Sequence, residues 1–167
     1  IGAALAREFA AQGCQVIATA RRLESLDSLK NINNIIFYEL DVTDINSIQI
    51  CIQDIQDKFG KLDILINNAG IPIMGPTAEI PLDELRQQWE VNLTAPVAMV
   101  QASLDLLSKG DQPKVVNIGS VSGILTTPFA GPYCASKAAL HCLNDALRME
   151  LAPFGIQVIL VQPGGIQ

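Results

Sequence analysis

Apolar runs of strand length alternate with helical segments along the whole 167-residue chain. The run at 62–70, LDILINNAG, is apolar up to its asparagines, which is typical of a strand buried on both faces of a parallel sheet. Further runs of this kind lie at 14–20, 35–40, 114–120 and 156–165. Parallel strands need crossover connections, and the intervening helices provide them. The alternation predicts an α/β fold with a doubly wound parallel sheet, built as one domain over 1–167.

The segments between these runs carry helical signals. The clearest is 45–59, whose isoleucines recur every three or four residues and which Thr43 or Asp44 can cap. We also expect helices over 1–13 (closed by Gly13), 23–30, 82–109 (bent near Pro96) and 132–152 (opened by a proline).

Composition excludes several classes of function. The net charge of -6 argues against a general nucleic-acid binder. No apolar run reaches the roughly 18 residues of a membrane span. The four cysteines show no CxxC or Cys/His ligand spacing, so we expect no metal site and free thiols in a reducing compartment. We expect a cytoplasmic protein that acts on a small molecule.

Unusual residues gather at the ends of the predicted strands, where doubly wound sheets bind ligands. A helix beginning near Ile1 and Gly2 would face a dinucleotide pyrophosphate. After the strand at 14–20, Arg21 and Arg22 follow an alanine rather than an acid, which suits the 2′-phosphate of NADP; the alternative is a solvated basic turn. The small residues Asn68, Ala69 and Gly70 suit close passage of a ribose, or form an ordinary turn.

Tyr133 and Lys137 are four residues apart on the last predicted helix, so their side chains share one face. An isolated tyrosine has a pKa of about 10, and a neighbouring cation lowers it. Together with Ser120 at the end of the preceding strand, the pair can form a proton-transfer site, although such a pair also occurs by chance. Asn92, inside a helical stretch, indicates a kink, a polar contact or a surface position. His141 indicates an interface or surface histidine rather than a ligand.

Taken together, these motifs resemble the short-chain dehydrogenase/reductase family over the whole chain. Ser120 precedes Tyr133 by thirteen positions, the usual interval of that family, and Tyr133 and Lys137 form its YxxxK motif. The resemblance implies that Asn92, Ser120, Tyr133 and Lys137 form the catalytic tetrad. It also implies that the cofactor contacts Ile1, Gly2, Arg21, Arg22, Asp41, Val42, Asn68, Ala69, Gly70, Tyr133, Lys137, Pro163, Gly164 and Ile166.

Within the family, the stretches 128–141 and 153–166 resemble the branch that contains 17β-hydroxysteroid dehydrogenases, retinol dehydrogenases and 1-acyldihydroxyacetone-phosphate reductase. This implies an NADP(H)-dependent oxidoreductase for a lipophilic carbonyl or secondary alcohol. The alternative is a non-catalytic dinucleotide-binding sensor or scaffold on the same fold. The resemblance also implies a homo-oligomer formed through the helices at 94–109 and 133–152.

The family pattern begins before Ile1 and continues beyond Gln167. We therefore expect the chain to be truncated at both ends, without the first strand, most of the glycine-rich loop and the C-terminal substrate region. The first strand would lie beside 62–67, so its absence should leave two unpaired sheet edges. A polypeptide of these 167 residues alone is expected to be inactive.

Overall fold

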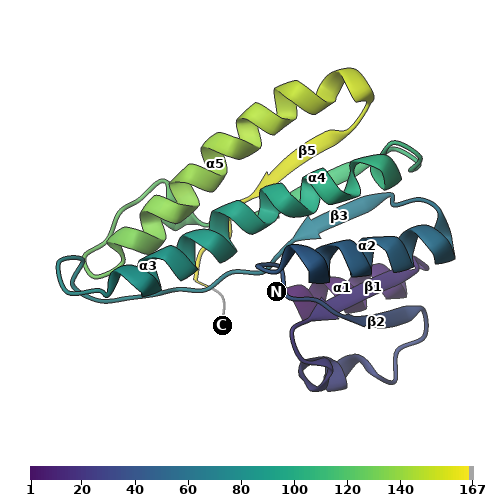
Figure 1. Ribbon diagram of the computed structural model, residues 1–167, viewed down its shortest axis with the longest axis horizontal. Coiled ribbons are helices and arrows are strands. Elements are labelled where there is room, and N and C mark those ends of the chain that lie inside the picture. The colour runs from purple at the N-terminus through teal and green to yellow at the C-terminus, as the bar shows by residue number, and fades with distance from the viewer. Residues whose placement is uncertain (166–167) are drawn as a thin grey trace.

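The computed structural model describes residues 1–165, and helices and strands alternate through it as expected (Figure 1). The strands are β1 (Val16–Ala20), β2 (Ile35–Glu39), β3 (Ile64–Asn67), β4 (Lys114–Ile118) and β5 (Gln157–Val161). The α-helices are α1 (Gly2–Ala11), α2 (Ile45–Phe59), α3 (Leu82–Trp89), α4 (Ala95–Leu107) and α5 (Gly131–Leu151). A π-helical turn, η2 (Glu90–Thr94), joins α3 to α4, and the 3-10 helices are η1 (Leu23–Leu29), η3 (Val121–Gly123) and η4 (Ala152–Phe154).

Every strand pairing is parallel. β1 pairs with β2 from Val16 opposite Ile35, and β4 lies between β3 and β5 with Lys114 opposite both Ile64 and Gln157. Within residues 1–165 the strands thus form two groups, and β1 and β3 each keep one unpaired edge. The expected pair of open edges is confirmed.

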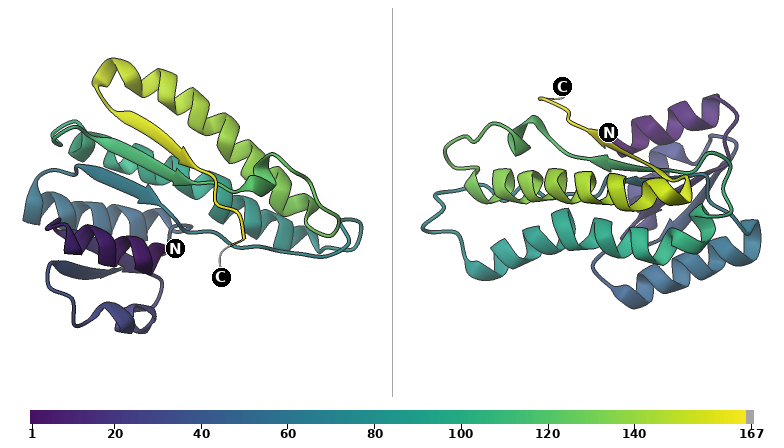
Figure 2. Two further views of the ribbon diagram at one scale, coloured as in Figure 1. Left: turned by 180° about the vertical axis from the view of Figure 1, so that it is seen from behind. Right: turned by 90° about the horizontal axis from the view of Figure 1, so that it is seen from above.

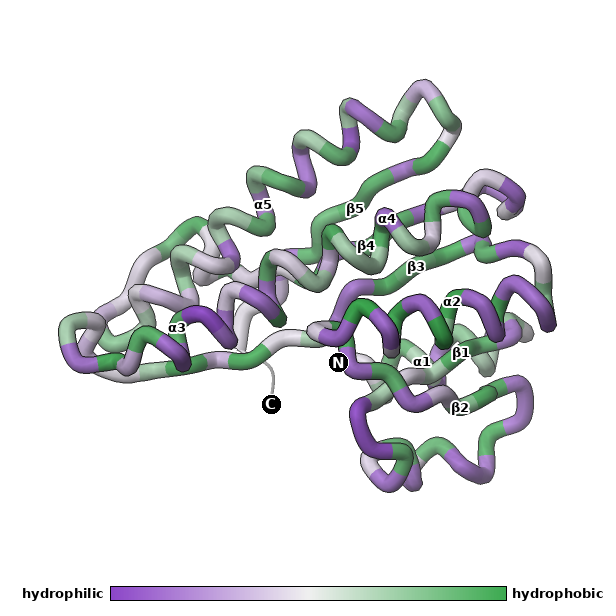
Figure 3. Tube along the Cα trace, in the orientation of Figure 1, coloured by the Kyte–Doolittle hydropathy of each residue, from purple (hydrophilic) through white to green (hydrophobic). Residues whose placement is uncertain are grey.

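Helices lie on both sides of the β1–β2 pair, as in a doubly wound fold, whereas the described helices cover one side of β3, β4 and β5. Helices α2, α4 and α5 lie on one face, and α1 lies on the other (Figure 2). The larger core forms beneath the first set and includes Ile48, Val100, Leu107 and Val115. Apolar residues follow the central strands in the hydropathy colouring (Figure 3). Along β3, however, half-buried and buried residues alternate, so the expectation of a strand buried on both faces is wrong within the described residues. Among the described helices, none combines the length and apolarity needed to cross a bilayer.

Local sequence signals explain where α2 begins and ends. The Asp44 carboxylate accepts a hydrogen bond from the Asn46 backbone N–H at 2.9 Å, which caps the first turn. Gly60 closes the helix in the left-handed conformation, with φ of 71°. The predicted alternatives at this start, Thr43 and Asp44, therefore resolve in favour of Asp44.

The long helical region at 82–109 is interrupted before Pro96 rather than at it. The π-helical turn η2 widens the helix so that the Ala95 N–H donates to the Glu90 carbonyl. Pro96 itself sits in the first turn of α4. Proline has no N–H to donate, and in a regular helix its ring would crowd the carbonyl of Asn92, four residues earlier, so the wider turn η2 precedes it.

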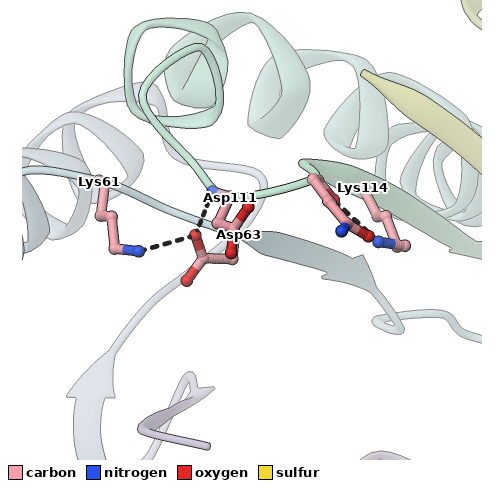
Figure 4. Close-up of polar contacts among 5 residues, drawn as sticks. Lys61, Asp63, Asp111 and Lys114 are labelled. Atoms are coloured by element: carbon pink, nitrogen blue, oxygen red, sulfur yellow. Dashed lines mark hydrogen bonds and ion pairs between the residues drawn. The ribbon is translucent and has the colours of Figure 1, made fainter. Parts of the chain in front are cut away.

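The amino ends of β3 and β4 are tied together by polar contacts of Asp63 (Figure 4). Its carboxylate accepts hydrogen bonds from the Asp111 backbone N–H at 2.6 Å and from Lys61 Nζ at 3.1 Å. The Asp111 bond is the main reason that the pKa of Asp63 is lowered. These contacts fix the loops at the edge of the sheet opposite the carboxyl strand ends.

Candidate active site

Helix α5 places Tyr133 and Lys137 on one face, as the four-residue spacing predicts. The Lys137 side chain is buried, and its Nζ donates to the backbone carbonyl of Ile118, at the end of β4, over 2.8 Å. The same nitrogen lies 5.9 Å from the centre of the Tyr133 ring. Burial lowers the pKa of Lys137 because it disfavours the charged ammonium. The helix therefore holds a cation close to a phenol.

Ser120 reaches the same space from the loop that follows β4. The residue is buried, and its Oγ accepts a hydrogen bond from the Ser122 backbone N–H at 3.1 Å, which caps η3. Because the oxygen is the acceptor in that bond, the hydroxyl proton is free to be donated to a ligand.

A cavity of about 450 Å³ joins these groups at the carboxyl ends of the strands. It brings together eight of the residues predicted for the site: Ile1, Asn68, Gly70, Ser120, Tyr133, Lys137, Pro163 and Gly164. Its remaining lining, not predicted, consists of Ile71, Pro72, Ile118 and Gly119. These four residues have no reactive side chain, so no sequence pattern marked them as part of a site.

Asn92 lies beneath this cavity and does not line it. The interpretation of Asn92 as a surface residue is wrong, since it is only 1% exposed. Its Oδ1 accepts from the Ile71 N–H, and its Nδ2 donates to the Ile71 carbonyl, each at 2.9 Å. Nδ2 also donates to Ser136 Oγ at 3.1 Å, and Ser136 donates in turn to the Tyr133 carbonyl at 2.8 Å. Asn92 thus connects the wall of the cavity to the first turns of α5 through Ser136, a residue that the sequence did not single out.

A row of buried asparagines supports the same end of the sheet. Asn67 Nδ2 donates to Asn117 Oδ1 at 2.8 Å, and Asn117 Nδ2 donates to Asn144 Oδ1 at 3.0 Å. The row joins β3, β4 and α5, and all three residues are buried. Polar side chains satisfied in this way specify one arrangement of the elements that they join.

The start of α1 lies against Asn68, on the wall of the cavity. A Cβ atom at Gly2 would come within 2.7 Å of Asn68 Nδ2, so a side chain could not be added without displacing Asn68. Because the Asn68 side chain is exposed and can turn aside, this contact shows a close approach of α1 to Asn68 and not a strict requirement for glycine. The amino end of α1, with Ile1 at the cavity, offers the free N–H groups and the partial positive charge that favour a phosphate.

Other predicted cofactor residues lie outside this cavity. Arg21 and Arg22 are exposed after β1, and Asp41 and Val42 follow β2. The Asp41 carboxylate accepts from Thr43 Oγ1 at 2.7 Å and from its N–H at 2.9 Å. These bonds, with a smaller effect of the Arg21 charge, lower the pKa of Asp41. These four predicted cofactor residues therefore lie at the carboxyl ends of β1 and β2, outside the cavity that Tyr133 lines.

Two further predicted residues do not belong to the cavity described. Ala69 is absent from its lining, although both of its neighbours in the chain, Asn68 and Gly70, contribute. Ile166 lies outside the described residues. A second hollow of about 780 Å³ runs between α2 and α4 and contains none of the predicted site residues. The chemistry-bearing side chains converge in the smaller cavity.

Known proteins of similar structure share this arrangement of elements. A short-chain dehydrogenase from Streptomyces avermitilis superposes with a TM-score of 0.91 at 37% identity, over 98% of this chain and 61% of its own. A gluconate 5-dehydrogenase from Burkholderia cenocepacia, solved with NADP and tartrate, gives a TM-score of 0.89 at 27% identity, over 98% of this chain and 66% of its own.

Sequence relatives point the same way. An NADPH-dependent 3-dehydrocapnine reductase from Ornithobacterium rhinotracheale is 38% identical, matching all of this chain and 62% of its own length. An NADPH-dependent 1-acyldihydroxyacetone phosphate reductase from Schizosaccharomyces pombe is also 38% identical, over all of this chain and 56% of its own. The chain thus spans about 60% of the length of these relatives. The model of the short chain dehydrogenase family matches residues 1–167. The chain therefore belongs to the short-chain dehydrogenase family.

Proposed function

We propose that the protein is an NADP(H)-dependent oxidoreductase that transfers hydride between the nicotinamide and a carbonyl or secondary alcohol. The observation that carries the proposal is the single cavity lined by Ser120, Tyr133 and Lys137. The nicotinamide, when bound, supplies the hydride chemistry. The amino end of α1 and the turn at Pro163 and Gly164 lie on the same cavity and are suited to hold it.

Each polar group has a distinct part in this proposal. Tyr133 donates a proton to the carbonyl oxygen during reduction and removes one from the alcohol during oxidation. The Lys137 ammonium, 5.9 Å from the centre of the Tyr133 ring, stabilises the negative charge left on Tyr133 when it gives up its proton. The Ser120 hydroxyl donates to the same substrate oxygen and fixes its orientation. Asn92 supports the site from below through Ile71 and Ser136.

NADP is the cofactor that the basic turn favours. Arg21 and Arg22 are exposed at the end of β1, where their guanidinium groups can bind a phosphate bidentately. Ala20 leaves no acid to repel that phosphate. The names of the two relatives from Ornithobacterium and Schizosaccharomyces, each called NADPH-dependent, agree with this choice.

The loops beside Tyr133 favour a lipophilic substrate. The segments 71–81 and 119–132 contain one charged residue between them, Glu79. They are joined by a hydrogen bond from the Gly75 N–H to the Phe129 carbonyl at 2.7 Å. Leu125 and Phe129 are exposed there, as is Met74. Exposed apolar side chains on the two loops that flank Tyr133 in the chain can bind the hydrocarbon part of a substrate while the polar groups of the cavity hold its oxygen.

The function is tested with Tyr133→Phe in the full-length gene product. We expect the variant to lose NADPH oxidation across a panel of lipid, steroid and retinoid carbonyls while it keeps wild-type affinity for NADPH. Unchanged turnover would remove Tyr133 from the mechanism. A wild-type protein that binds NADPH and turns over none of the carbonyls would favour the alternative, a dinucleotide-binding sensor or scaffold.

We further propose a cytoplasmic homo-oligomer that associates through α4 and α5. Leu104 on α4 and Met149 on α5 are exposed apolar residues that a partner could cover. Sedimentation analysis of Leu104→Glu would then show a smaller species than wild type. The 167-residue polypeptide alone is expected to aggregate or to fail to bind NADPH, because the open edges of β1 and β3 favour association with other chains. A monodisperse polypeptide with micromolar NADPH affinity would contradict that expectation.

A further inference from the structure

His141 lies on α5 one turn beyond Lys137, with its ring against the loop that carries Ser120. The Ser120 backbone N–H donates to His141 Nε2 at 3.4 Å. On the other side of the ring, Nδ1 is 3.3 Å from the side-chain amide nitrogen of Gln162. The imidazole therefore bridges the loop after β4 and the end of β5, where the strand runs into Pro163.

Two glycines make the slot that holds this ring. A Cβ at Gly119 would lie 2.5 Å from His141 Nε2, and a Cβ at Gly123 would overlap His141 Cε1. Neither glycine has the positive φ that only glycine adopts readily, so the requirement is for space. The sequence GSVSG at 119–123 thus carries Ser120 between two positions shaped by the imidazole.

We propose that His141 is a positioning residue of the active site, and that its neutral imidazole holds the Ser120 backbone beside the Pro163 turn. With Nε2 as the acceptor from Ser120, the single proton of the neutral ring is on Nδ1. Nδ1–H then donates to the oxygen of the Gln162 amide, whose two ends are interchangeable by a half-turn. A second link, from the Val121 N–H to the Pro163 carbonyl at 3.0 Å, joins the same two loops.

The surroundings of the ring favour its neutral form. Burial and the charge of Lys137 lower the pKa of His141, and Asp145 opposes them. These two charged neighbours are both on α5. The segments packed against the ring, 119–123 and 157–165, contain no titratable side chain. Protonation would place an N–H at Nε2 opposite the Ser120 N–H, so the two donors would repel and Ser120 would move. Activity should therefore fall as pH decreases through a value below 6.5.

The tautomer can be tested without any substrate. In the unliganded full-length protein labelled with ¹⁵N, we expect His141 to show a protonated Nδ1 and an unprotonated Nε2. The Ser120 amide resonance should titrate together with the ring. A ring that carries its proton on Nε2, or a Ser120 amide whose chemical shift does not change as the ring titrates, would overturn the inference. Neither result would affect the proposed oxidoreductase function.

The kinetic consequence rests on the proposed function. His141→Phe keeps a ring but removes the acceptor of the Ser120 N–H, and we expect kcat to fall about tenfold because the Ser120 hydroxyl is then less well positioned for the transition state. NADPH affinity should stay near the wild-type value. His141→Gln restores an acceptor that does not titrate, so it should recover most of kcat and abolish its loss at low pH. Glu150→Gln, exposed on the same helix more than two turns beyond His141, is the control and should leave kcat and its pH dependence unchanged. Equal loss in the Phe and Gln variants, or a low-pH loss that persists in the Gln variant, would overturn the inference.

Discussion

Ser136→Ala should destabilise the protein, although it removes only one oxygen atom. Ser136 is fully buried, and its Oγ is one of the two acceptors for the Asn92 amide group. Without it, one N–H of a side chain that is 1% exposed has no partner. A buried donor left unpaired costs about 1–3 kcal/mol. We expect that loss in the free energy of unfolding, measured by urea denaturation monitored by circular dichroism.

The chain offers a matched control in Ser103. It is also fully buried, but its Oγ has no hydrogen-bond partner among the described residues. Ser103→Ala therefore removes a hydroxyl that gains nothing from burial, and should be neutral or stabilising. If both variants change the free energy of unfolding by the same amount, the network from Ile71 through Asn92 to Ser136 does not stabilise the site as argued.

Two further substitutions test the charges of the site. Arg21→Ala should weaken NADPH binding about tenfold or more while NADH binding changes little, as isothermal titration would show, because a charge-assisted bond to phosphate is lost; equal losses would refute the phosphate assignment. Lys137→Met should abolish turnover. Since burial lowers the folded-state pKa of Lys137, the wild type should gain stability relative to the variant as pH rises towards 10.5; a stability difference independent of pH would contradict this.

Much of the fold could be predicted because its signals are local. The isoleucines of α2 recur on one face, Asp44 caps that helix, and Gly60 ends it. The apolar run before Asn67 indicated a strand of a parallel sheet, which β3 is, although only one of its two faces is fully buried. The spacing of Tyr133 and Lys137 placed both on one face of α5, and the alternation of elements brought Ser120 to the same end of the sheet.

The remaining features depend on contacts between residues distant in the chain. Asn92 resembled a surface residue because asparagine is a mediocre helix former, and its partners Ile71 and Ser136 lie 21 and 44 positions away. The π-helical turn Glu90–Thr94 also contains Asn92 and directly precedes Pro96, which has no N–H to continue the regular helix. His141 likewise carries no local signal, because its slot is formed by Gly119 and Gly123 across the loop.

The central claim is that this cavity directs hydride transfer from NADPH to a carbonyl carbon. Its most direct test is turnover of an accepted lipophilic ketone with NADPH deuterated at the transferable position of C4, followed by mass spectrometry of the alcohol. We predict one deuterium on the new carbinol carbon with wild-type protein and no labelled alcohol with Tyr133→Phe. Two results would contradict the account. One is an alcohol that contains no deuterium, whichever face of the nicotinamide C4 is labelled; the other is as much labelled alcohol from the Tyr133→Phe variant as from wild type.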